Sequence, residues 1–201
     1  MKAFITLSLL LFSTTIYAQF SPASVENIAR NIVPADFEGG FNGHTIYDIH
    51  EDRNGLLWIA SADGLFQFDG RHFREAKQFP RESMGEVLSL SSWGDSILAG
   101  TSKGLFIYSH TSQEVSHFSA DSSLSPDNIL NNRIESMMKD EAGIWMGSWF
   151  GVSFLDAKRH QFHHYPLSER VENPQYGAAV HALGRKEGKI WLGTWAGEVY
   201  S

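Results

Sequence analysis

Two tryptophans occupy matching positions in the short motifs Gly-Ser-Trp-Phe-Gly and Gly-Thr-Trp-Ala-Gly. They are Trp149 and Trp195. Each motif ends on a glycine, which favours a tight turn, so each indole is expected in a hairpin loop. An indole at such a place can stack on a sugar ring or an aromatic ligand, or it can pack against a neighbouring segment. Both roles stay open for these two residues.

A second candidate set occupies one position of a repeated strand. Tyr47, Leu88, Glu135 and His181 align there, and the chemistry of this position changes from repeat to repeat while its neighbours stay apolar. Side chains of such a strand can line a central channel and contact a ligand, or they can face solvent without a function. Tyr47, Glu135 and His181, together with the two tryptophans, are the predicted ligand-binding residues.

The sequence predicts no catalytic residue, no metal site and no cofactor. It contains no nucleophile elbow, no phosphate-binding glycine loop and no His-Glu-x-x-His motif. Histidines are dense only at 160–164. On a strand, His160 and His164 would share a face but lie about 13 Å apart at ~3.3 Å per residue, which is too far for one metal ion. Solvated histidines of an outer strand are therefore expected.

These candidates belong to a repeat that occurs four times along the chain. The anchor positions are 40, 47 and 46 residues apart, and each is followed six residues later by a glycine. The anchors are Trp58, Leu98, Trp145 and Trp191. A period of this length that is built from short strands is typical of β-propeller blades.

Each repeat has the pattern of four short strands. In the first, Asn54-Gly55 predicts a tight hairpin turn after strand 46–51, and aromatic and β-branched residues dominate the segments between turns. The predicted fold is all-β: a β-propeller with about three and a half four-stranded blades of a larger ring, of seven blades. The blades are expected at 46–76, 87–118, 134–165 and 180–201, the last one incomplete, within a partial propeller of residues 44–201.

Both faces of each blade are expected to be buried. Apolar residues recur in the first strand three positions apart, as in Val87 and Leu90, and on a regular strand such residues point to opposite faces. The tryptophan anchors Trp58, Trp145 and Trp191 are expected in the core, since they occupy the buried second strand.

The N-terminus predicts export. Lys2 precedes an apolar run that ends at Ala18, so residues 1–18 are expected to be a secretory signal peptide and 19–43 a lead-in segment. Without Lys2 the chain has 15 basic and 23 acidic residues, a net charge of −8. This charge argues against nucleic acid and against electrostatic binding to an anionic membrane. The chain has no cysteine for a disulfide or a lipid anchor.

The repeats resemble the two-component regulator propeller repeat. The best match is IYDIHEDRNGLLWIASADGLFQFDG, residues 46–70, and GIWMGSWFG and KIWLGTWAG match in the third and fourth repeats. The second repeat departs most, because Leu98 stands where tryptophan is usual. The resemblance implies a periplasmic sensor of an unknown small molecule or glycan. It also implies a parent protein held in the inner membrane by a C-terminal span that this chain lacks, with a histidine kinase or diguanylate cyclase output.

Other arrangements and functions stay open. The predicted half-ring exposes two apolar blade faces, so self-association through these faces, or a truncated product, is expected. A four-bladed ring completed by residues 20–33 and a ring shared by two chains are the alternatives. The alternative functions are a secreted scaffold that binds another protein and, less favoured, a propeller lyase or glycosidase.

Overall fold

The computed structural model describes residues 45–121, 124–167 and 178–201, all of which lie in the compact unit that runs from Phe37 to Ser201. The predicted signal peptide and lead-in segment lie outside the described residues. Within those ranges the chain is built of strands, with one short helix, α2 (Arg81–Met84). No helix in them has the length and apolar composition to cross a bilayer.

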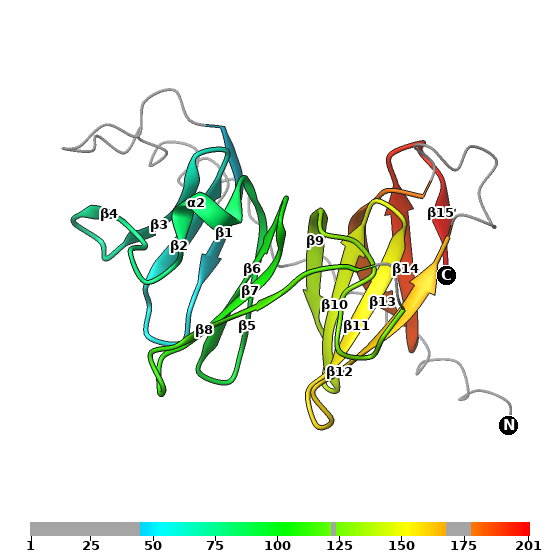
Figure 1. Cartoon of the computed structure of the whole chain (residues 1–201). Helices are drawn as coiled ribbons and strands as arrows, with labels where there is room; N and C mark the ends of the chain where they lie inside the picture. The colour runs from blue at the N-terminus through cyan, green and yellow to red at the C-terminus, as the bar shows by residue number, and fades with distance from the viewer. Residues whose placement is uncertain (1–44, 122–123, 168–177) are drawn as a thin grey trace, which may run out of the picture. The chain divides into compact units, whose positions relative to one another are not determined.

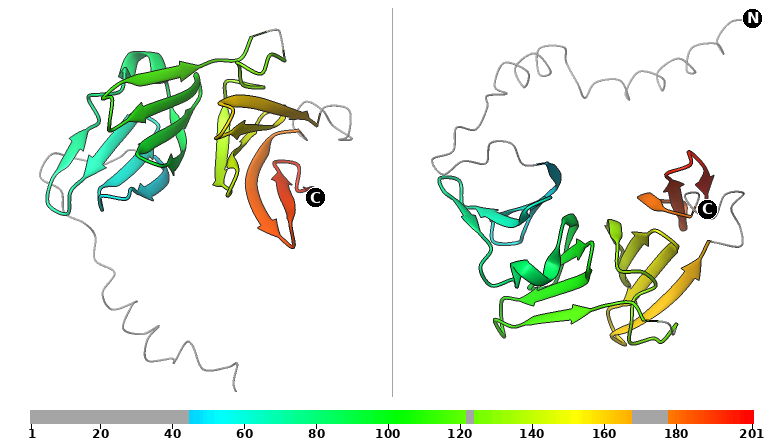
Figure 2. Two further views of the ribbon diagram at one scale, coloured as in Figure 1. Left: turned by 90° about the horizontal axis from the view of Figure 1, so that it is seen from below. Right: turned by 45° about the horizontal axis from the view of Figure 1, so that its top comes forward.

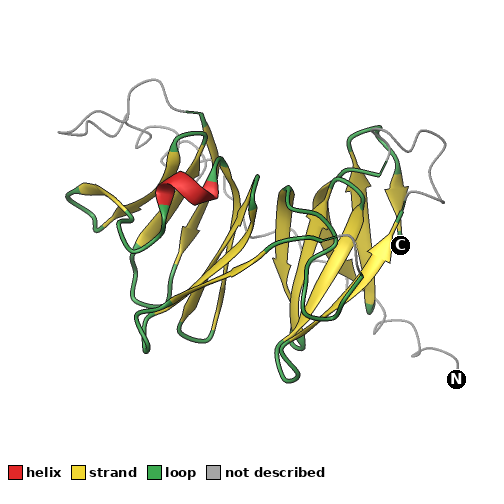
Figure 3. Cartoon of the chain, viewed as in Figure 1, coloured by secondary structure: helices red, strands yellow, loops and turns green. Residues whose placement is uncertain are grey.

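Three four-stranded sheets and one three-stranded sheet follow one another in chain order, each with its strands paired antiparallel to their neighbours (Figures 1 and 3). Blade one is β1 (Ile46–Glu51), β2 (Leu57–Ser61), β3 (Gly64–Phe68) and β4 (Phe73–Glu75). Blade two is β5 (Val87–Trp93), β6 (Ser96–Thr101), β7 (Gly104–Ser109) and β8 (Val115–Phe118). Blade three is β9 (Ile134–Lys139), β10 (Gly143–Ser148), β11 (Gly151–Asp156) and β12 (Gln161–Pro166). Blade four is β13 (Val180–Lys186), β14 (Lys189–Thr194) and β15 (Val199–Tyr200).

The sheets are arranged as propeller blades, which confirms the predicted all-β propeller class. The first strands of consecutive blades contact one another: β1 contacts β5, β5 contacts β9 and β9 contacts β13. The first strands therefore lie innermost, and the later strands of each blade lie progressively farther out (Figure 2). Three apolar clusters separate the four blades, one at each blade–blade interface.

The hairpin between the second and third strands closes in the same way in each of the first three blades. A buried hydroxyl at the end of the second strand donates to the carbonyl of the glycine that opens the third strand: Ser61 to Gly64, Thr101 to Gly104, and Ser148 to Gly151. These glycines have φ between 124° and 135°, which other residues rarely adopt. The repeated Ser/Thr and Gly are thus explained by local hairpin chemistry.

The aspartate of the first turn explains the tryptophan of the second strand. The buried Asp52 accepts hydrogen bonds from the indole Nε1 of Trp58 at 3.0 Å and from the backbone N–H of Asn54 and of Leu56. Burial opposes its ionisation, but these hydrogen bonds and the nearby His110 hold the pKa of Asp52 below its ordinary value. Asp140 and Trp145 repeat the aspartate–indole pair in blade three.

A β-bulge in the first strand corrects one expectation from the sequence. Ile46 pairs with Ser61. Ile49, three residues later, pairs with Ile59, which is only two residues before Ser61. Tyr47 is the extra residue, so Ile46 and Ile49 point to the same face, and the prediction of opposite faces is wrong.

The same bulge recurs in the other blades, and both apolar positions of the first strand face the preceding blade. Val87 and Leu90 of blade two both join the cluster against blade one. Blades two and three are nevertheless covered on both faces. In blade two the second strand provides the two faces, because Ile97 belongs to the cluster on one side and Leu98 to the cluster on the other.

The outer faces of blades one and four are less covered. Trp58 is fully buried, but Trp191 is 40% exposed, so its predicted place in the core is wrong. The reason is its direction: Trp58 faces the next blade, and no further blade among the described residues packs on the corresponding face of β14. On blade one, Ile49 is 59% exposed on the opposite side. The predicted self-association through propeller faces would cover these side chains.

Gly147, which precedes Ser148 at the end of β10, gives a testable packing prediction. A Cβ on Gly147 would meet the hydroxyl of Ser136 and the backbone carbonyl of Val180 in blade four. We expect Gly147→Ala to lower the free energy of unfolding by about 1–3 kcal/mol, because the next blade must move away. Gly184→Ala is the matched control, since nothing lies within 4 Å of its Cβ. Equal urea midpoints for the two variants would contradict this packing.

Candidate functional site

A pocket of about 530 Å³ lies where the inner strands begin, and we call it the blade-end pocket. All five residues that the sequence singled out line it, and two further residues, Arg133 and Ala179, complete the lining. The five are Tyr47 of blade one, Glu135 and Trp149 of blade three, and His181 and Trp195 of blade four. The structure therefore brings together residues that are up to 148 positions apart in the sequence.

Two local features aim these side chains at the pocket. Tyr47, Glu135 and His181 are the extra residues of the first-strand bulges, which re-aim a side chain out of the regular pleat. The tryptophans sit in the hairpins between the second and third strands, where Trp149 is 40% and Trp195 is 68% exposed. Leu88, the bulge residue of blade two, is buried and does not line the pocket.

Arg133 is the centre of the polar network and was not predicted from the sequence. Its Nη1 donates to Glu86 Oε2 at 2.8 Å and its Nε donates to Glu135 Oε1 at 2.6 Å. Its guanidinium lies 5.9 Å from the centre of the Trp149 ring, a cation–π arrangement. Arg133 and Glu86 each lie directly before the first strand of a blade. The residue at this position differs in charge between blades, as the bulge residue does, and this variation could have marked both as candidate site residues.

Glu135 connects the arginine to both tryptophans. Its Oε1 also accepts a hydrogen bond from the indole Nε1 of Trp149 at 2.8 Å. Its Oε2 lies 3.8 Å from Nδ1 of His181, whose ring centre is 4.8 Å from that of Trp195. Because the Glu135 side chain is only 9% exposed, these partners largely determine where it lies.

Hydrogen bonds and nearby charges shift the pKa of three groups at this site. The hydrogen bond to Glu86 raises the pKa of Tyr47. The hydrogen bonds from Arg133 and Tyr47 lower the pKa of Glu86, against a smaller effect of burial. Burial opposes the charge on Arg133, but its hydrogen bonds to Glu86 and Glu135 keep its pKa above the ordinary value. Glu86 and Arg133 are therefore charged and hydrogen-bonded to each other before any ligand arrives.

The pocket combines aromatic side chains with polar side chains that are held in place by hydrogen bonds and ion pairs. Trp149 and Trp195 offer flat surfaces, and Arg133, Glu135 and His181 offer donors and acceptors for hydroxyl groups. Of the charged groups that line the pocket, the Glu135 carboxylate and the Arg133 guanidinium cancel with His181 neutral, which favours a neutral ligand. Among the described residues no group of three or more His, Asp or Glu side chains could hold a metal ion.

The fold is that of a β-propeller in solved structures as well. The chain aligns with the extracellular domain of a protein assigned to the hybrid two component systems of B. thetaiotaomicron, at a TM-score of 0.65 and 23% identity over 77% of this chain and 22% of that one. The extracellular domain of a protein assigned to the one component systems of the same organism aligns at a TM-score of 0.59 and 16% identity, over 80% of this chain and 22% of that one. Virginiamycin B lyase from Staphylococcus aureus aligns at 0.60 and 14% identity, over 81% and 53%. The chain thus spans about a fifth of the length of the first two.

A family model points to the particular kind of propeller. Residues 40–63 match the model described as two component regulator propeller, a segment that includes β1 and β2. The chain therefore carries the two component regulator propeller repeat, and the resemblance noted in its sequence is confirmed. No curated protein matches the sequence.

Proposed function

We propose that this chain is the ligand-binding propeller of an exported sensor, and that the blade-end pocket is its binding site. The observation that carries the proposal is the convergence of Tyr47, Glu135, Trp149, His181 and Trp195, from three blades, on one pocket. Hydrogen bonds to Glu135 from Trp149 and Arg133, and to Glu86 from Tyr47, hold the pocket in place before binding. Such preorganisation reduces the entropy cost of holding a ligand.

The ligand that fits best is a neutral ring with several hydroxyl groups, such as a glycan fragment. Its apolar ring face would stack on the indoles of Trp149 and Trp195, and its hydroxyl groups would bond to Arg133 and Glu135. The apolar run before Ala18 supports export to the periplasm. The family repeat supports a parent protein that passes the binding signal to a kinase or cyclase through an inner-membrane span.

Binding to a panel of neutral oligosaccharides, measured by calorimetry, tests the proposal. For a ligand found this way, we expect Trp195→Ala to weaken binding about tenfold, which corresponds to about 1.4 kcal/mol. Phe150→Ala is the matched control: Phe150 is an exposed aromatic residue beside Trp149 but does not line the pocket. A ligand whose affinity is unchanged in Trp195→Ala, or lowered equally in both variants, would place its site elsewhere.

An enzymatic role is the second candidate, because the pocket holds one acid–base pair. Glu135 and His181 meet at 3.8 Å. Asp48, a carboxylate of β1, accepts hydrogen bonds from the backbone N–H of Ile49 and of Leu90 and does not line the pocket. A lyase or glycosidase would change its ligand chemically during incubation. Recovery of the ligand intact after hours with the protein would favour the sensor.

A further inference from the structure

Blade two lacks the tryptophan that fills the space between blades elsewhere. Leu98 has the same place in its sheet as Trp58 in blade one and Trp145 in blade three, in the middle of the second strand. In blade one the indole lies edge-on to Phe79 at 6.0 Å and to His110 of blade two at 6.2 Å. A leucine is smaller than an indole and cannot occupy the same volume.

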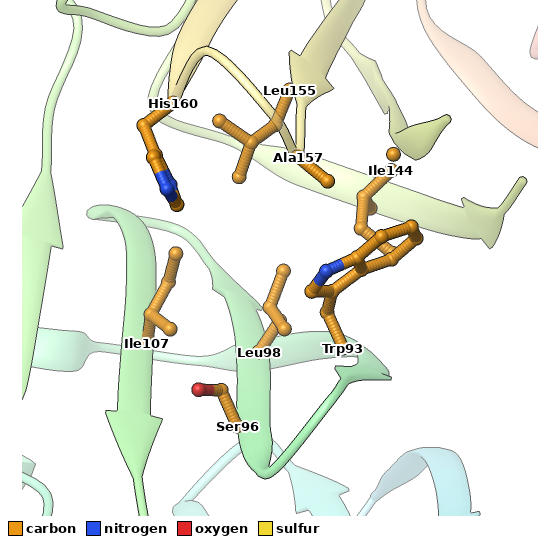
Figure 4. A pocket seen from close by; sticks show the side chains of 9 residues that line it. Trp93, Ser96, Leu98, Ile107, Ile144, Leu155, Ala157 and His160 are labelled. Atoms are coloured by element: carbon orange, nitrogen blue, oxygen red, sulfur yellow. The ribbon is translucent and has the colours of Figure 1, made fainter. Parts of the chain in front are cut away.

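A cavity of about 120 Å³ lies beside Leu98, between blades two and three (Figure 4). We call it the Leu98 cavity. Its walls are mostly apolar and come from both blades, and in Figure 4 the side chains of both blades point into the space between them. The lining residues are Trp93, Ser96, Leu98 and Ile107 of blade two, and Gly143, Ile144, Leu155, Ala157 and His160 of blade three.

The size and the chemistry of this cavity favour a flat aromatic molecule. An enclosed apolar cavity of roughly 150 Å³ stays dry and takes up benzene, because water finds too few polar partners in it. The Leu98 cavity is of similar size and is mostly apolar, but it is partly open to solvent. The polar groups of the lining are the Ser96 hydroxyl, the His160 ring and the indole N–H of Trp93. Ser96 Oγ already donates to Asp95 Oδ1 at 3.4 Å, so it could accept from a single N–H or hydroxyl of a guest. The turn residue Asp95 is already bonded to the backbone N–H of Thr111.

We propose that the Leu98 cavity is a binding site for planar aromatic molecules of about the size of indole. The ligand takes the place that an indole side chain occupies in the neighbouring blades. The site is separate from the blade-end pocket, because Trp93 and Ser96 lie where β5 ends and β6 begins, and the blade-end pocket lies where the first strands begin. The proposal does not depend on the proposed function.

Titration of the whole chain with indole tests the proposal. We expect the melting temperature to rise with the logarithm of the indole concentration, and calorimetry to show one saturable site. Leu98→Trp should weaken indole binding at least tenfold while raising the melting temperature of the free protein. If Leu98→Trp does not fold, Ala157→Leu fills the same cavity from blade three and should weaken binding likewise.

Trp195→Ala separates the two sites, because it alters the blade-end pocket and leaves the Leu98 cavity intact. Indole binding that persists in Trp195→Ala and is lost in the cavity-filling variants supports the proposal. Absence of saturable binding at millimolar indole would overturn it. Binding that is lost in Trp195→Ala and kept in Leu98→Trp would overturn it too, since indole would then occupy the blade-end pocket.

Discussion

Trp58→Ala should lower the free energy of unfolding by about 3–5 kcal/mol, the range for removing a large aromatic residue from a core. Trp58 is fully buried between blades one and two, and its indole donates to the buried Asp52 at 3.0 Å. The variant would lose the apolar burial of the ring, leave a cavity against Phe79 and deprive the Asp52 carboxylate of one donor. Urea unfolding followed by circular dichroism measures the effect.

Trp195→Ala is the control for this prediction, since it is the same substitution at a side chain that is 68% exposed. We expect it to change the free energy of unfolding by no more than about 0.5 kcal/mol. Similar losses in the two variants would mean that Trp58 does not connect blade one to blade two in solution, and the interface seen in the structure would then be in doubt.

The repeat and its hairpins could be predicted from the sequence because they depend on local chemistry. A glycine with positive φ, such as Gly64, and an Asn-Gly turn at Asn54 act within a few residues of the chain, so a single sequence shows them. The four aligned copies then indicated blades. The predicted first strand, residues 46–51, has the bounds of β1.

The directions of side chains could not be predicted, since they depend on the register between strands. One extra residue at Tyr47 reverses the expected face of Ile49, and nothing in the sequence of β1 alone marks a bulge there. The prediction that Trp191 lies in the core was wrong for a similar reason. In the other blades the next blade buries this position, but no described blade follows blade four, so Trp191 is exposed.

The candidate site was found through variation between the repeats rather than through a motif. One position of the first strand holds tyrosine, leucine, glutamate and histidine in the four blades, so packing does not require one type of side chain there. Three of these four residues line the pocket. Arg133 was not predicted, because its main partner, Glu86, is 47 residues away in the sequence and belongs to another blade. Such pairings arise only when the blades are set side by side.

The Arg133 network should also respond to pH. The pKa of Glu86 is lowered below its ordinary value of 4.5 by its hydrogen bonds to Arg133 and Tyr47. A carboxyl group whose pKa is lower in the folded state stabilises the fold above the unfolded pKa and loses that contribution as the pH falls through the folded pKa. The stability that depends on this group is therefore complete at neutral pH and declines below about pH 4.5.

Arg133→Ala should lower the free energy of unfolding by about 2 kcal/mol, less than for a fully buried pair because Arg133 and Glu86 are partly exposed. The substitution leaves Glu135 and Glu86 without their shared cation and removes the contact with Trp149. We expect the affinity for a ligand of the blade-end pocket to fall at least tenfold, and the loss of stability between pH 7 and pH 3 to become smaller. Urea unfolding at both pH values and calorimetric titration measure these effects.

Arg185→Ala is the matched control, because Arg185 also joins two blades through a carboxylate, Asp140, at 2.7 Å, but neither residue lines the pocket. Arg185 is 44% exposed, so we expect a loss of no more than about 1 kcal/mol and unchanged ligand affinity. If both variants bind ligand as the unmodified chain does, Arg133 only joins the blades. If Arg133→Ala alone loses affinity, the ion pairs that hold the blades together also hold Glu135 and Trp149 in place for the ligand.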